Sequence, residues 1–430
     1  MNLSNERVIL VGGYPKEIKK ADYQRRMLEL ENLSKTAGVS VEAKITQTFE
    51  KQNPTFYIGK GKLEEIKKIC HHKKVTTLIF NDNLSQSQVK NISAFTRCKV
   101  IDRTQLILDI FAIHAKTNRA KLQVELAQLE YNYSRLKHLW GHLSRIEGGI
   151  GTRGPGEKQI EIDRRLIQKR IQHLKEKLEE IRQITYTKRS NRGKFKVIAL
   201  VGYTNAGKST IFNRLTQANV TAVDQLFATI DPSSRYIPVP KGNHSILTDT
   251  IGFIKDLPHC LIESFHSTLV EVINADLLLH VIDLSEPDFE SNMEAVNSVL
   301  KEIGADDIDT CLVFNKTDLI GGIGFKLLKK QLKERYPHTI FLSAVEDSDM
   351  KLLLDKVCER LEKRKGETQL EIPMKMEKLI AFLEKKVEII SMDCDPEKDA
   401  YIVEVRGERE LLSEVKEQLE KFNQLEYINS

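Results

Sequence analysis

The chain has 430 residues, a net charge of +5 and 40% apolar residues, which suffices for several packed cores and about three domains. No secretory or membrane-spanning segment is visible, and the six cysteines lack paired spacing, so the sequence favours neither a membrane protein nor a disulfide framework. We therefore expect a cytoplasmic protein with free thiols. The run Cys70-His71-His72 has no second ligand pair at a zinc-like distance, and we expect no metal there.

Strand-like and helix-like runs alternate through residues 1–102 and predict a small parallel α/β domain. The predicted strands are 7–11, 39–46, 75–80 and 99–101, and the predicted helices are 22–36, 62–71 and 85–95. One unusual run, Gly59-Lys60-Gly61-Lys62, lies at the N-terminus of a predicted helix. Its exposed amides could hold an anion, but the pattern favours a plain loop and helix cap.

Residues 103–190 predict two long helices that pair with each other. Apolar residues recur at steps of four and three in both helices, at Leu122, Leu126, Leu129, Tyr133, Leu136, Trp140 and Leu143, and at Ile167, Ile171, Leu174, Leu178 and Ile181. Such seams are typical of paired helices. The connection, 148–156, is too short for anything but an antiparallel hairpin.

The hairpin tip has a composition that suggests a function. It holds five glycines in nine residues, which are costly to order and more than a turn requires. Between residues 157 and 192, 11 Lys or Arg stand against 6 Asp or Glu, a surplus that equals the net charge of the whole chain. The tip is either a side-chain-poor probe for a narrow RNA-lined space or a merely flexible loop, and the basic surplus is either an RNA contact or a solvated helix face.

A phosphate-binding loop is predicted at Gly202-Tyr203-Thr204-Asn205-Ala206-Gly207-Lys208-Ser209, between an apolar strand (196–201) and a helix (210–215). Gly202 and Gly207 let the backbone amides converge on phosphates. Lys208 supplies a point charge to the outer phosphates, and the Ser209 hydroxyl is a ligand for Mg²⁺.

Two further runs complete a nucleotide site. Asp249-Thr250-Ile251-Gly252 follows a second apolar strand, so that Asp249 can hold the metal through water while the Gly252 amide faces the γ-phosphate. In Asn315-Lys316-Thr317-Asp318, the Asp318 carboxylate can accept two hydrogen bonds from guanine that adenine cannot donate. Such a polar pair rejects the wrong base by roughly 10⁴-fold, so the ordered set predicts binding and hydrolysis of GTP.

The remaining elements predict the fold of the domain that carries these motifs and of the domain that follows it. Strands at 276–284, 310–314 and 339–342 and a helix at 350–364 indicate a doubly wound, mostly parallel P-loop GTPase domain over 195–364. Residues 363–366 are interpreted as a linker. A small α+β domain is predicted over 368–430, from strands and helices at 371–374, 378–385, 387–392, 401–406 and 408–422. We find no chemistry in it and expect a docking or stabilising module.

The run Gly148-Gly149-Ile150-Gly151-Thr152-Arg153-Gly154-Pro155-Gly156-Glu157, continuing to Asp163-Arg164-Arg165, resembles the hallmark of the HflX family. Members of that family are ribosome-associated GTPases, and the resemblance covers residues 1–365. It implies binding to the large ribosomal subunit and its RNA, with the hairpin tip reaching toward the peptidyl transferase centre. It also implies splitting or rescue of stalled ribosomes under stress.

The motifs and the resemblance together assign site residues. Nucleotide binding is assigned to Gly202, Tyr203, Thr204, Asn205, Ala206, Gly207, Lys208, Ser209, Thr210, Asp249, Asn315, Lys316, Asp318, Ser343 and Ala344. Catalytic roles are assigned to Lys208, Thr229 and Gly252, and Mg²⁺ ligation to Ser209, Thr229 and Asp249. By the resemblance, Thr229 is the switch I threonine and Ser343-Ala344 the fifth GTPase motif. Ribosome contact is expected from Gly149, Gly151, Arg153, Gly154, Gly156, Arg164 and Arg165.

Hydrolysis is expected to be slow without a partner. Many relatives of this fold have a water-orienting glutamine after Asp-x-x-Gly, but here Phe253 follows Gly252. Another group, such as ribosomal RNA or a monovalent cation, must then position water or supply charge. Asn205 is either a ligand for K⁺, as in cation-dependent GTPases, or a small polar loop residue.

Three functions remain open from the sequence, and for each we expect a monomer that binds GTP and GDP. The favoured one is a ribosome-splitting GTPase, because of the glycine tip on a basic hairpin. The second is a GTPase partner of an RNA-modification enzyme, for which the expected dimerising module is missing. The third is an ATP-dependent RNA-remodelling protein that acts through residues 59–62 under control of the GTPase domain.

Overall fold

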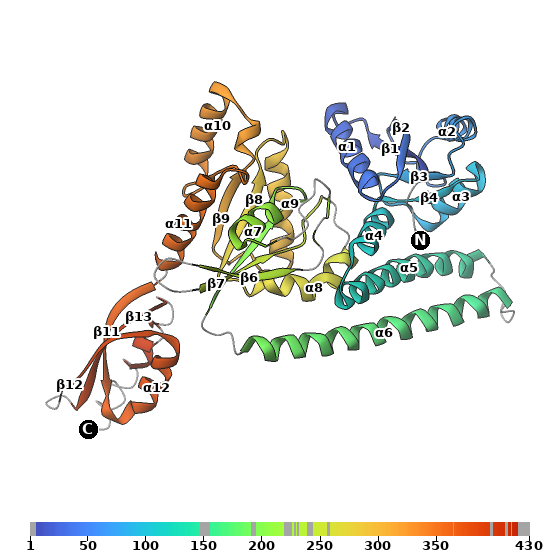
Figure 1. Cartoon of the computed structure of the whole chain (residues 1–430). Helices are drawn as coiled ribbons and strands as arrows, with labels where there is room; N and C mark the ends of the chain where they lie inside the picture. Colours follow the sequence, from blue (N-terminus) through green and yellow to red (C-terminus); the bar gives the residue numbers. More distant parts are fainter. Residues whose placement is uncertain are drawn as a thin grey trace. The chain divides into compact units, whose positions relative to one another are not determined.

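The computed structural model describes residues 6–146, 155–190, 195–218, 226, 227, 229, 232–238, 244–255, 259–363, 365–395, 399–408, 412, 413 and 415–419. The chain forms two compact units, Met1–Pro238 with Asn243–Met350, and Val239–Gly242 with Lys351–Ser430 (Figure 1). The finer division into four domains stays a prediction. Gly149, Gly151, Arg153 and Gly154 of the predicted tip lie outside the described residues.

The first unit begins with a parallel sheet in the order β2-β1-β3-β4. The strands are β1 (Arg7–Pro15), β2 (Ser40–Phe49), β3 (Thr77–Phe80) and β4 (Lys99–Ile101), and the helices between them are α1 (Lys20–Thr36), α2 (Lys60–Lys73) and α3 (Gln86–Thr96). Val8 and Leu10 of β1 pack into one core, whereas Ile9 and Val11 pack into another. Both faces of this sheet are therefore covered, and the predicted α/β fold is confirmed.

Local sequence signals set the ends of these helices. Ser85 caps α3, since its hydroxyl accepts from the Gln88 amide at 3.2 Å and the Gln88 side chain accepts from the Ser85 amide at 2.9 Å. Asp102 caps the next helix, α4 (Arg103–His114), by accepting from the Gln105 amide at 2.9 Å.

Helix α4 was not predicted as a separate element. Leu106, Ile107, Leu108, Ile110 and Phe111 are all buried, so the helix is apolar on nearly every side. A helix buried all round lacks the heptad pattern of a helix with one apolar stripe. For this reason the apolar spacing that predicts the hairpin begins only at Leu122.

The two hairpin helices are α5 (Asn118–Ile146) and α6 (Pro155–Ser190), and their pairing is confirmed. Leu126, Leu174 and Leu178 are buried between them, with partly buried Leu122, Leu129 and Ile171 beside these three. Ion pairs Arg170–Glu125 at 2.7 Å and Lys175–Glu130 at 2.8 Å lie along the contact. The side chains of Leu136, Trp140 and Leu143 lie outside the described residues.

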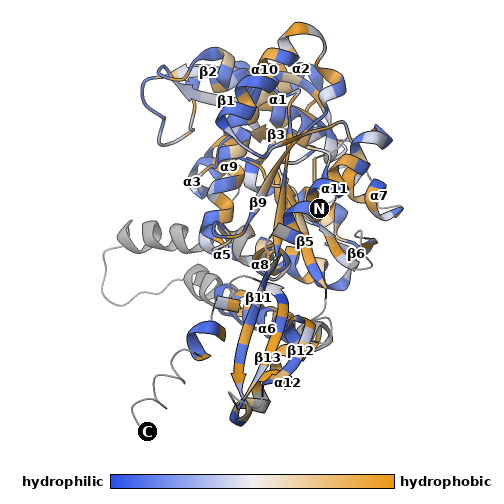
Figure 2. Cartoon of the chain, turned by 90° about the vertical axis from the view of Figure 1, so that its left-hand side faces the viewer, coloured by the Kyte–Doolittle hydropathy of each residue, from blue (hydrophilic) through white to orange (hydrophobic). Residues whose placement is uncertain are grey.

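A six-stranded sheet carries the predicted nucleotide motifs, in the order β10-β9-β8-β5-β7-β6. Its strands are β5 (Lys196–Gly202), β6 (Ser233–Pro238), β7 (His244–Asp249), β8 (Leu277–Asp283), β9 (Thr310–Asn315) and β10 (Ile340–Phe341). Its helices are α7 (Lys208–Thr216), α8 (His259–Ile273), α9 (Phe289–Glu302) and α10 (Gly322–Arg335). Only β6 pairs antiparallel, and hydrophobic residues concentrate on inner strands such as β9 (Figure 2). The mostly parallel GTPase-type sheet is thus confirmed.

The second unit contains an antiparallel sheet in the order β11-β13-β12. Helix α11 (Asp347–Lys363) precedes β11 (Lys365–Pro373), which is followed by a short 3₁₀ turn η2 (Met374–Met376), α12 (Glu377–Lys386), β12 (Glu388–Asp395) and β13 (Ala400–Glu408). The linker interpretation of residues 363–366 is wrong, because Gly366 already pairs with Gly407 in the sheet. Strand β11 begins with charged residues that resemble a linker, and its buried residues, Leu370 and Ile372, come later in the strand.

Among the described residues, no helix combines the length and the apolar character that crossing a membrane would require.

Candidate nucleotide-binding site

The loop from β5 to α7 has a backbone that only glycine fits at two positions. Gly202 has a φ of 151°, and a Cβ there would lie 2.2 Å from the Val281 carbonyl oxygen. Gly207 has a φ of 96°, and a Cβ there would lie 2.2 Å from Asn315 Nδ2. The loop therefore curves tightly against neighbouring strands, and α7 begins directly after it at Lys208. This is the geometry in which helix N-terminal amides receive a phosphate.

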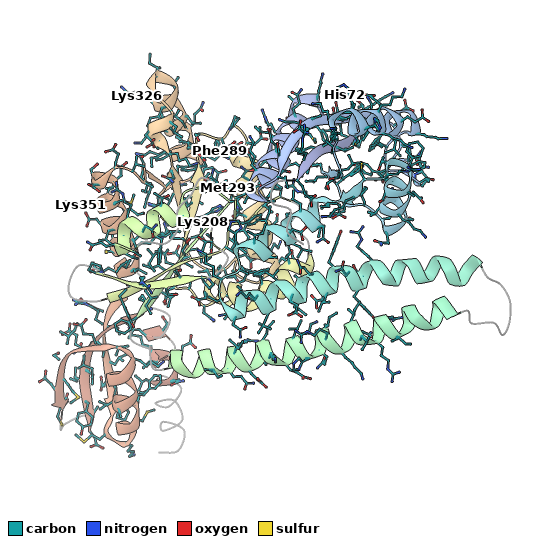
Figure 3. All side chains as sticks on the ribbon, turned by 45° about the vertical axis from the view of Figure 1, so that its right-hand side comes forward. His72, Lys208, Phe289, Met293, Lys326 and Lys351 are labelled. Atoms are coloured by element: carbon teal, nitrogen blue, oxygen red, sulfur yellow. The ribbon has the colours of Figure 1, made fainter. Side chains whose placement is uncertain are left out.

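Lys208, labelled in Figure 3, is buried at the start of α7. Its Nζ donates to the carbonyl oxygens of Gly202 at 3.1 Å and Tyr203 at 2.7 Å, and the residue is only 5% exposed. Burial lowers the pKa of Lys208 to about 8, and the nearby Asp249 carboxylate acts in the opposite direction. A phosphate group would supply the counter-charge that this buried amine favours.

Three oxygen-bearing side chains from separate segments meet beside the loop. Ser209 Oγ donates to Asp249 Oδ2 at 2.7 Å, Thr229 Oγ1 donates to the same oxygen at 3.1 Å, and the two hydroxyl oxygens lie 2.9 Å apart. Burial raises the pKa of Asp249, while Lys208 and the two hydroxyls act to lower it. Among the described residues, buried Asp249 Oδ1 has no hydrogen-bond partner. This all-oxygen cluster fits a hard cation such as Mg²⁺.

The segment after Asp249 is tied to the phosphate loop by backbone hydrogen bonds. The Phe253 amide donates to the Gly202 carbonyl at 3.1 Å, and the Thr204 amide donates to the Phe253 carbonyl at 2.8 Å. A Cβ at Gly252 would lie 2.8 Å from Thr204 Cγ2 and 3.1 Å from Lys208 Nζ. Gly252 is therefore in close contact with the loop, as its predicted role requires.

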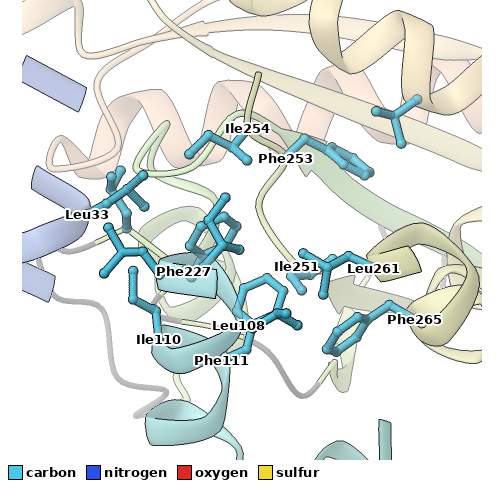
Figure 4. Close-up of a cluster of buried hydrophobic side chains, with 14 of the residues drawn as sticks. Leu33, Leu108, Ile110, Phe111, Phe227, Ile251, Phe253, Ile254, Leu261 and Phe265 are labelled. Carbon is cyan, nitrogen blue, oxygen red and sulfur yellow. The ribbon is translucent and has the colours of Figure 1, made fainter. Parts of the chain in front are cut away.

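The Phe253 ring lies in the hydrophobic core with Ile254 and Ile251 (Figure 4). The residue is 1% exposed, so it can take no part in orienting water.

The predicted base-recognition residues come together at the ends of β9 and β10. Asn315 Nδ2 donates to the Ala206 carbonyl at 2.9 Å, and Asn315 Oδ1 accepts from the Ala344 amide at 2.9 Å. Exposed Asp318 accepts from Ser343 Oγ at 2.5 Å. One asparagine thus links the phosphate loop to the Ser343-Ala344 segment, and a serine fixes the carboxylate that we assign to guanine.

Some residues at the site were missed by the sequence analysis. Asp283 accepts from Lys316 Nζ at 2.6 Å, and Asp349 accepts from the Ser343 amide at 2.7 Å. His280 on β8 is 1% exposed, and burial, together with Lys208, lowers its pKa to about 3. No local pattern signals these residues. The only sequence hint is that Asp283 ends a buried strand at the same sheet edge as the motifs.

Phe227, two residues before Thr229, rests on helix α4. Its φ is 58°, it is 2% exposed, and its ring centroid lies 4.6 Å from that of Phe111 (Figure 4). Phe111 also contacts Phe265 of α8 at 5.1 Å. A single residue of α4 therefore touches both the segment that carries Thr229 and the helix that follows the Gly252 segment.

The predicted ribosome-contact residues and the run 59–62 differ in whether they are exposed or already bonded within the protein. Arg164 Nε donates to the Tyr133 hydroxyl at 3.2 Å, and its guanidinium stacks on that ring, whereas Arg165 is exposed. Gly156 lies in the first turn of α6. At the run 59–62, the Gly59 amide donates to Gln47 Oε1 at 2.8 Å and Lys62 pairs with Glu65 at 2.6 Å. These bonds favour the helix-cap interpretation over the anion site, and they give no support to an ATP-dependent function.

Family models cover three consecutive parts of the chain. A GTP-binding GTPase N-terminal model matches residues 24–112, a GTP-binding GTPase middle-region model matches residues 114–192, and a 50S ribosome-binding GTPase model matches residues 197–316.

Curated relatives match almost end to end. GTPase HflX of Caldanaerobacter subterraneus subsp. tengcongensis is 41% identical over 97% of this chain and 94% of its own length, and GTPase HflX of Escherichia coli K12 is 42% identical over 86% of each. A crystal structure of a GTP-binding protein from Sulfolobus solfataricus in complex with GDP is 26% identical over 83% of this chain and 99% of that chain, with a TM-score of 0.43. By its identity to these curated proteins over nearly its full length, the chain belongs to the HflX family and is a GTPase.

Proposed function

We propose that this GTPase binds the large ribosomal subunit in the cytoplasm and uses its nucleotide cycle to split or rescue stalled ribosomes under stress. The observation that carries the proposal is the α5–α6 hairpin, a long basic projection that follows directly after the helix on which Phe227 rests. The match of residues 197–316 to a model described as a 50S ribosome-binding GTPase supports it.

The hairpin has the dimensions and the surface for contact with RNA. Helix α6 has 36 residues, which corresponds to a length of about 54 Å. Arg165, Lys169 and Lys177 are exposed along it and could neutralise phosphates. Because Arg164 is engaged with Tyr133, Arg165 is the better candidate for direct RNA contact.

We assign the chemistry of the nucleotide cycle to the residues gathered at the loop. Ser209, Thr229 and Asp249 would hold Mg²⁺, which supplies neutralising charge to the phosphates when it is bound. Lys208 would bind the outer phosphates, and the Gly252 amide would contact the γ-phosphate. Asn205 has a φ of 62°, a conformation that asparagine tolerates well, so its loop role has a structural reason and its binding of K⁺ stays a prediction.

The base of the hairpin is connected to helix α4, on which Phe227 rests, and contacts helix α8, which follows the Gly252 segment. Phe227 packs on α4, and α4 leads into α5 after three residues. On the other side, Gln123 Nε2 of α5 donates to the Ser264 carbonyl of α8 at 3.2 Å, and Ser264 Oγ donates to Glu130 at 3.1 Å. Loss of the γ-phosphate would therefore act on the base of the hairpin through α4 and through α8.

The test is a sucrose-gradient profile of 70S ribosomes incubated with the protein and GTP, GDP or a non-hydrolysable GTP analogue. We expect subunits to accumulate with GTP or the analogue and not with GDP. Arg165→Glu should reduce splitting, whereas Lys330→Glu, the same charge change on exposed α10, should leave it intact. Unchanged 70S peaks in every nucleotide state, or equal effects of the two variants, would contradict the proposal.

A second assay measures phosphate release with and without purified 50S subunits. Because Phe253 is buried, we expect slow hydrolysis by the protein alone and strong stimulation by the subunit. Replacing Gly154 and Gly156 with tryptophan should abolish the stimulation but leave the basal rate unchanged.

A further inference from the structure

The hydroxyl group of Tyr203 links three segments that are far apart in the sequence. It donates to Glu29 Oε1 of α1, and it accepts from the backbone amide of Lys255 at 2.9 Å. Tyr203 itself belongs to the phosphate loop, whereas Lys255 lies three residues after Gly252. The hydroxyl thus joins the N-terminal α/β part, the phosphate loop and the segment that senses the γ-phosphate.

The acceptor Glu29 is itself held in place. Its other oxygen, Oε2, accepts from Arg103 Nη2 at 2.6 Å, and Arg103 Nη1 donates to Asn81 Oδ1 at 3.2 Å. The Arg103 side chain is 7% exposed and that of Glu29 is 19% exposed, so the pair is largely shielded from water. A buried, paired carboxylate is a strong and stationary acceptor.

Burial and the Glu29 carboxylate raise the pKa of Tyr203, so the phenol keeps its proton and remains a donor. The residues Tyr203, Glu29 and Lys255 also line a cleft of about 600 Å³, together with Thr204 and Asn205 of the phosphate loop. The hydrogen bonds therefore stand beside the nucleotide loop, at the place where the N-terminal part meets it.

We propose that Tyr203 is a positioning residue for GTP hydrolysis, through which Glu29 of the N-terminal part fixes the segment 252–255 relative to the phosphate loop. Two backbone hydrogen bonds already join Phe253 to the loop, and the Tyr203 hydroxyl supplies the third bond, at Lys255. With all three bonds the Gly252 amide has one defined position. Without the third bond the segment after Phe253 gains freedom, and the amide meets the γ-phosphate less often in the reactive geometry.

This role is independent of the proposed action on ribosomes, because it concerns hydrolysis by the protein alone. It is also separate from the backbone contacts that the loop makes to phosphates, since the hydroxyl faces Glu29 and Lys255. A change confined to the hydroxyl should consequently act on the rate constant of hydrolysis more than on nucleotide affinity.

The experiment compares Tyr203→Phe with wild type in steady-state GTP hydrolysis by the full chain. Tyr57→Phe is the matched control, because it also deletes a buried hydroxyl, one that donates to the Gly13 carbonyl at 2.9 Å away from the nucleotide loop. We expect Tyr203→Phe to lower kcat about tenfold with KM within about twofold of wild type, the loss expected for one hydrogen bond to a charged group. The control should leave both constants unchanged. A kcat of Tyr203→Phe within twofold of wild type, or an equal loss in the control, would overturn the proposal.

A second variant tests whether Glu29 acts through Tyr203. Glu29→Gln should lower kcat by about threefold in the wild-type background and have no further effect in the Tyr203→Phe background, as coupled residues in a double-mutant cycle do. If the effects of Glu29→Gln and Tyr203→Phe multiply, the two residues act independently and the proposed connection is wrong.

Discussion

In the described part of the chain, one parallel sheet and one mostly parallel sheet have glycines at or near the carboxyl end of a central strand, but only the second carries the candidate nucleotide site. At the end of β5, the space beside Gly202 and Gly207 is bounded by the Val281 carbonyl and Asn315. At the end of β1, a Cβ on Gly12 would lie 2.4 Å from the Tyr23 hydroxyl, and one on Gly13 would lie 2.6 Å from the Phe49 ring. Aromatic side chains fill the second edge, whereas backbone and polar groups line the first.

The polar groups at the two edges also differ in how they are satisfied. At the β1 edge, Tyr57 donates to the Gly13 carbonyl and Tyr23 donates to Asp82 at 3.2 Å, so the polar atoms pair with one another. At the β5 edge, a buried lysine donates to two carbonyl oxygens, and Asp249 Oδ1 has no hydrogen-bond partner among the described residues. Glycines near the carboxyl end of a central strand are therefore no sufficient sign of a phosphate site. What distinguishes such a site is buried charge that still needs a counter-charge.

The sharpest way to break this comparison is to remove the loop lysine. We expect Lys208→Ala to reduce GTP hydrolysis by roughly 10³-fold or more, because the charge on the outer phosphates is lost. Lys60→Ala, at the glycine-lysine run of α2, should leave the rate unchanged. Phosphate release measures both variants, and nucleotide turnover that survives Lys208→Ala would show a second active site.

Base choice should depend on Asp318. Replacing it by asparagine leaves one acceptor oxygen for the two guanine donors and puts an NH₂ donor in place of the other, which should weaken GTP binding by roughly 10²- to 10⁴-fold. Xanthosine triphosphate carries a carbonyl at position 2 and can accept from the new amide, so its binding should improve. Titrations with the two nucleotides check the exchange. A variant that still prefers GTP would place guanine recognition elsewhere.

Removing the Phe111–Phe227 contact tests whether helix α4 supports the switch I segment that carries Phe227 and Thr229. Phe111→Ala should cost about 3–5 kcal/mol of stability and should also lower kcat, because Phe227 loses its support and Thr229 its fixed position. Phe80→Ala is a matched control, since Phe80 is equally buried and packs edge-on against Tyr57. It should lower the melting temperature similarly without changing kcat at temperatures where both variants are folded. Equal kcat values in the two variants would contradict the support role.

The smallest expected effect concerns Asp82, which accepts a hydrogen bond from Tyr23 near the carboxyl end of β1. Burial raises the pKa of Asp82 above its ordinary value of 3.8, against the hydrogen bonds from Tyr57 and Tyr23 and the charge of Arg26. The protonated carboxyl thus contributes stability below pH 3.8, and this contribution is lost as the pH rises through the folded-state pKa. Asp82→Asn should therefore stabilise the protein at pH 7, and the gain should shrink as the pH falls below 3.8. Melting curves across this range provide the test, and a variant less stable than wild type at pH 7 would contradict the assignment.

The nucleotide-binding motifs could be predicted from the sequence because each is a short run of characteristic residues directly after an apolar strand. The phosphate loop, Asp249 and Asn315 each follow a buried strand, and parallel strands bring their carboxyl ends to one edge. The contacts that join separate parts could not be predicted. Tyr203 and Glu29 are 174 residues apart, and neither position has a local pattern that names its partner. Helix α4 was not predicted because a helix that is buried on nearly all sides lacks the apolar periodicity of a helix with one buried face.

Calorimetric titration of the full chain with GDP and with ATP tests the central claim most directly. The account predicts one GDP site per chain, lost in Lys208→Ala, and ATP binding at least roughly 10²-fold weaker. Comparable affinity for ATP and GDP, or nucleotide uptake that persists in Lys208→Ala, would contradict it.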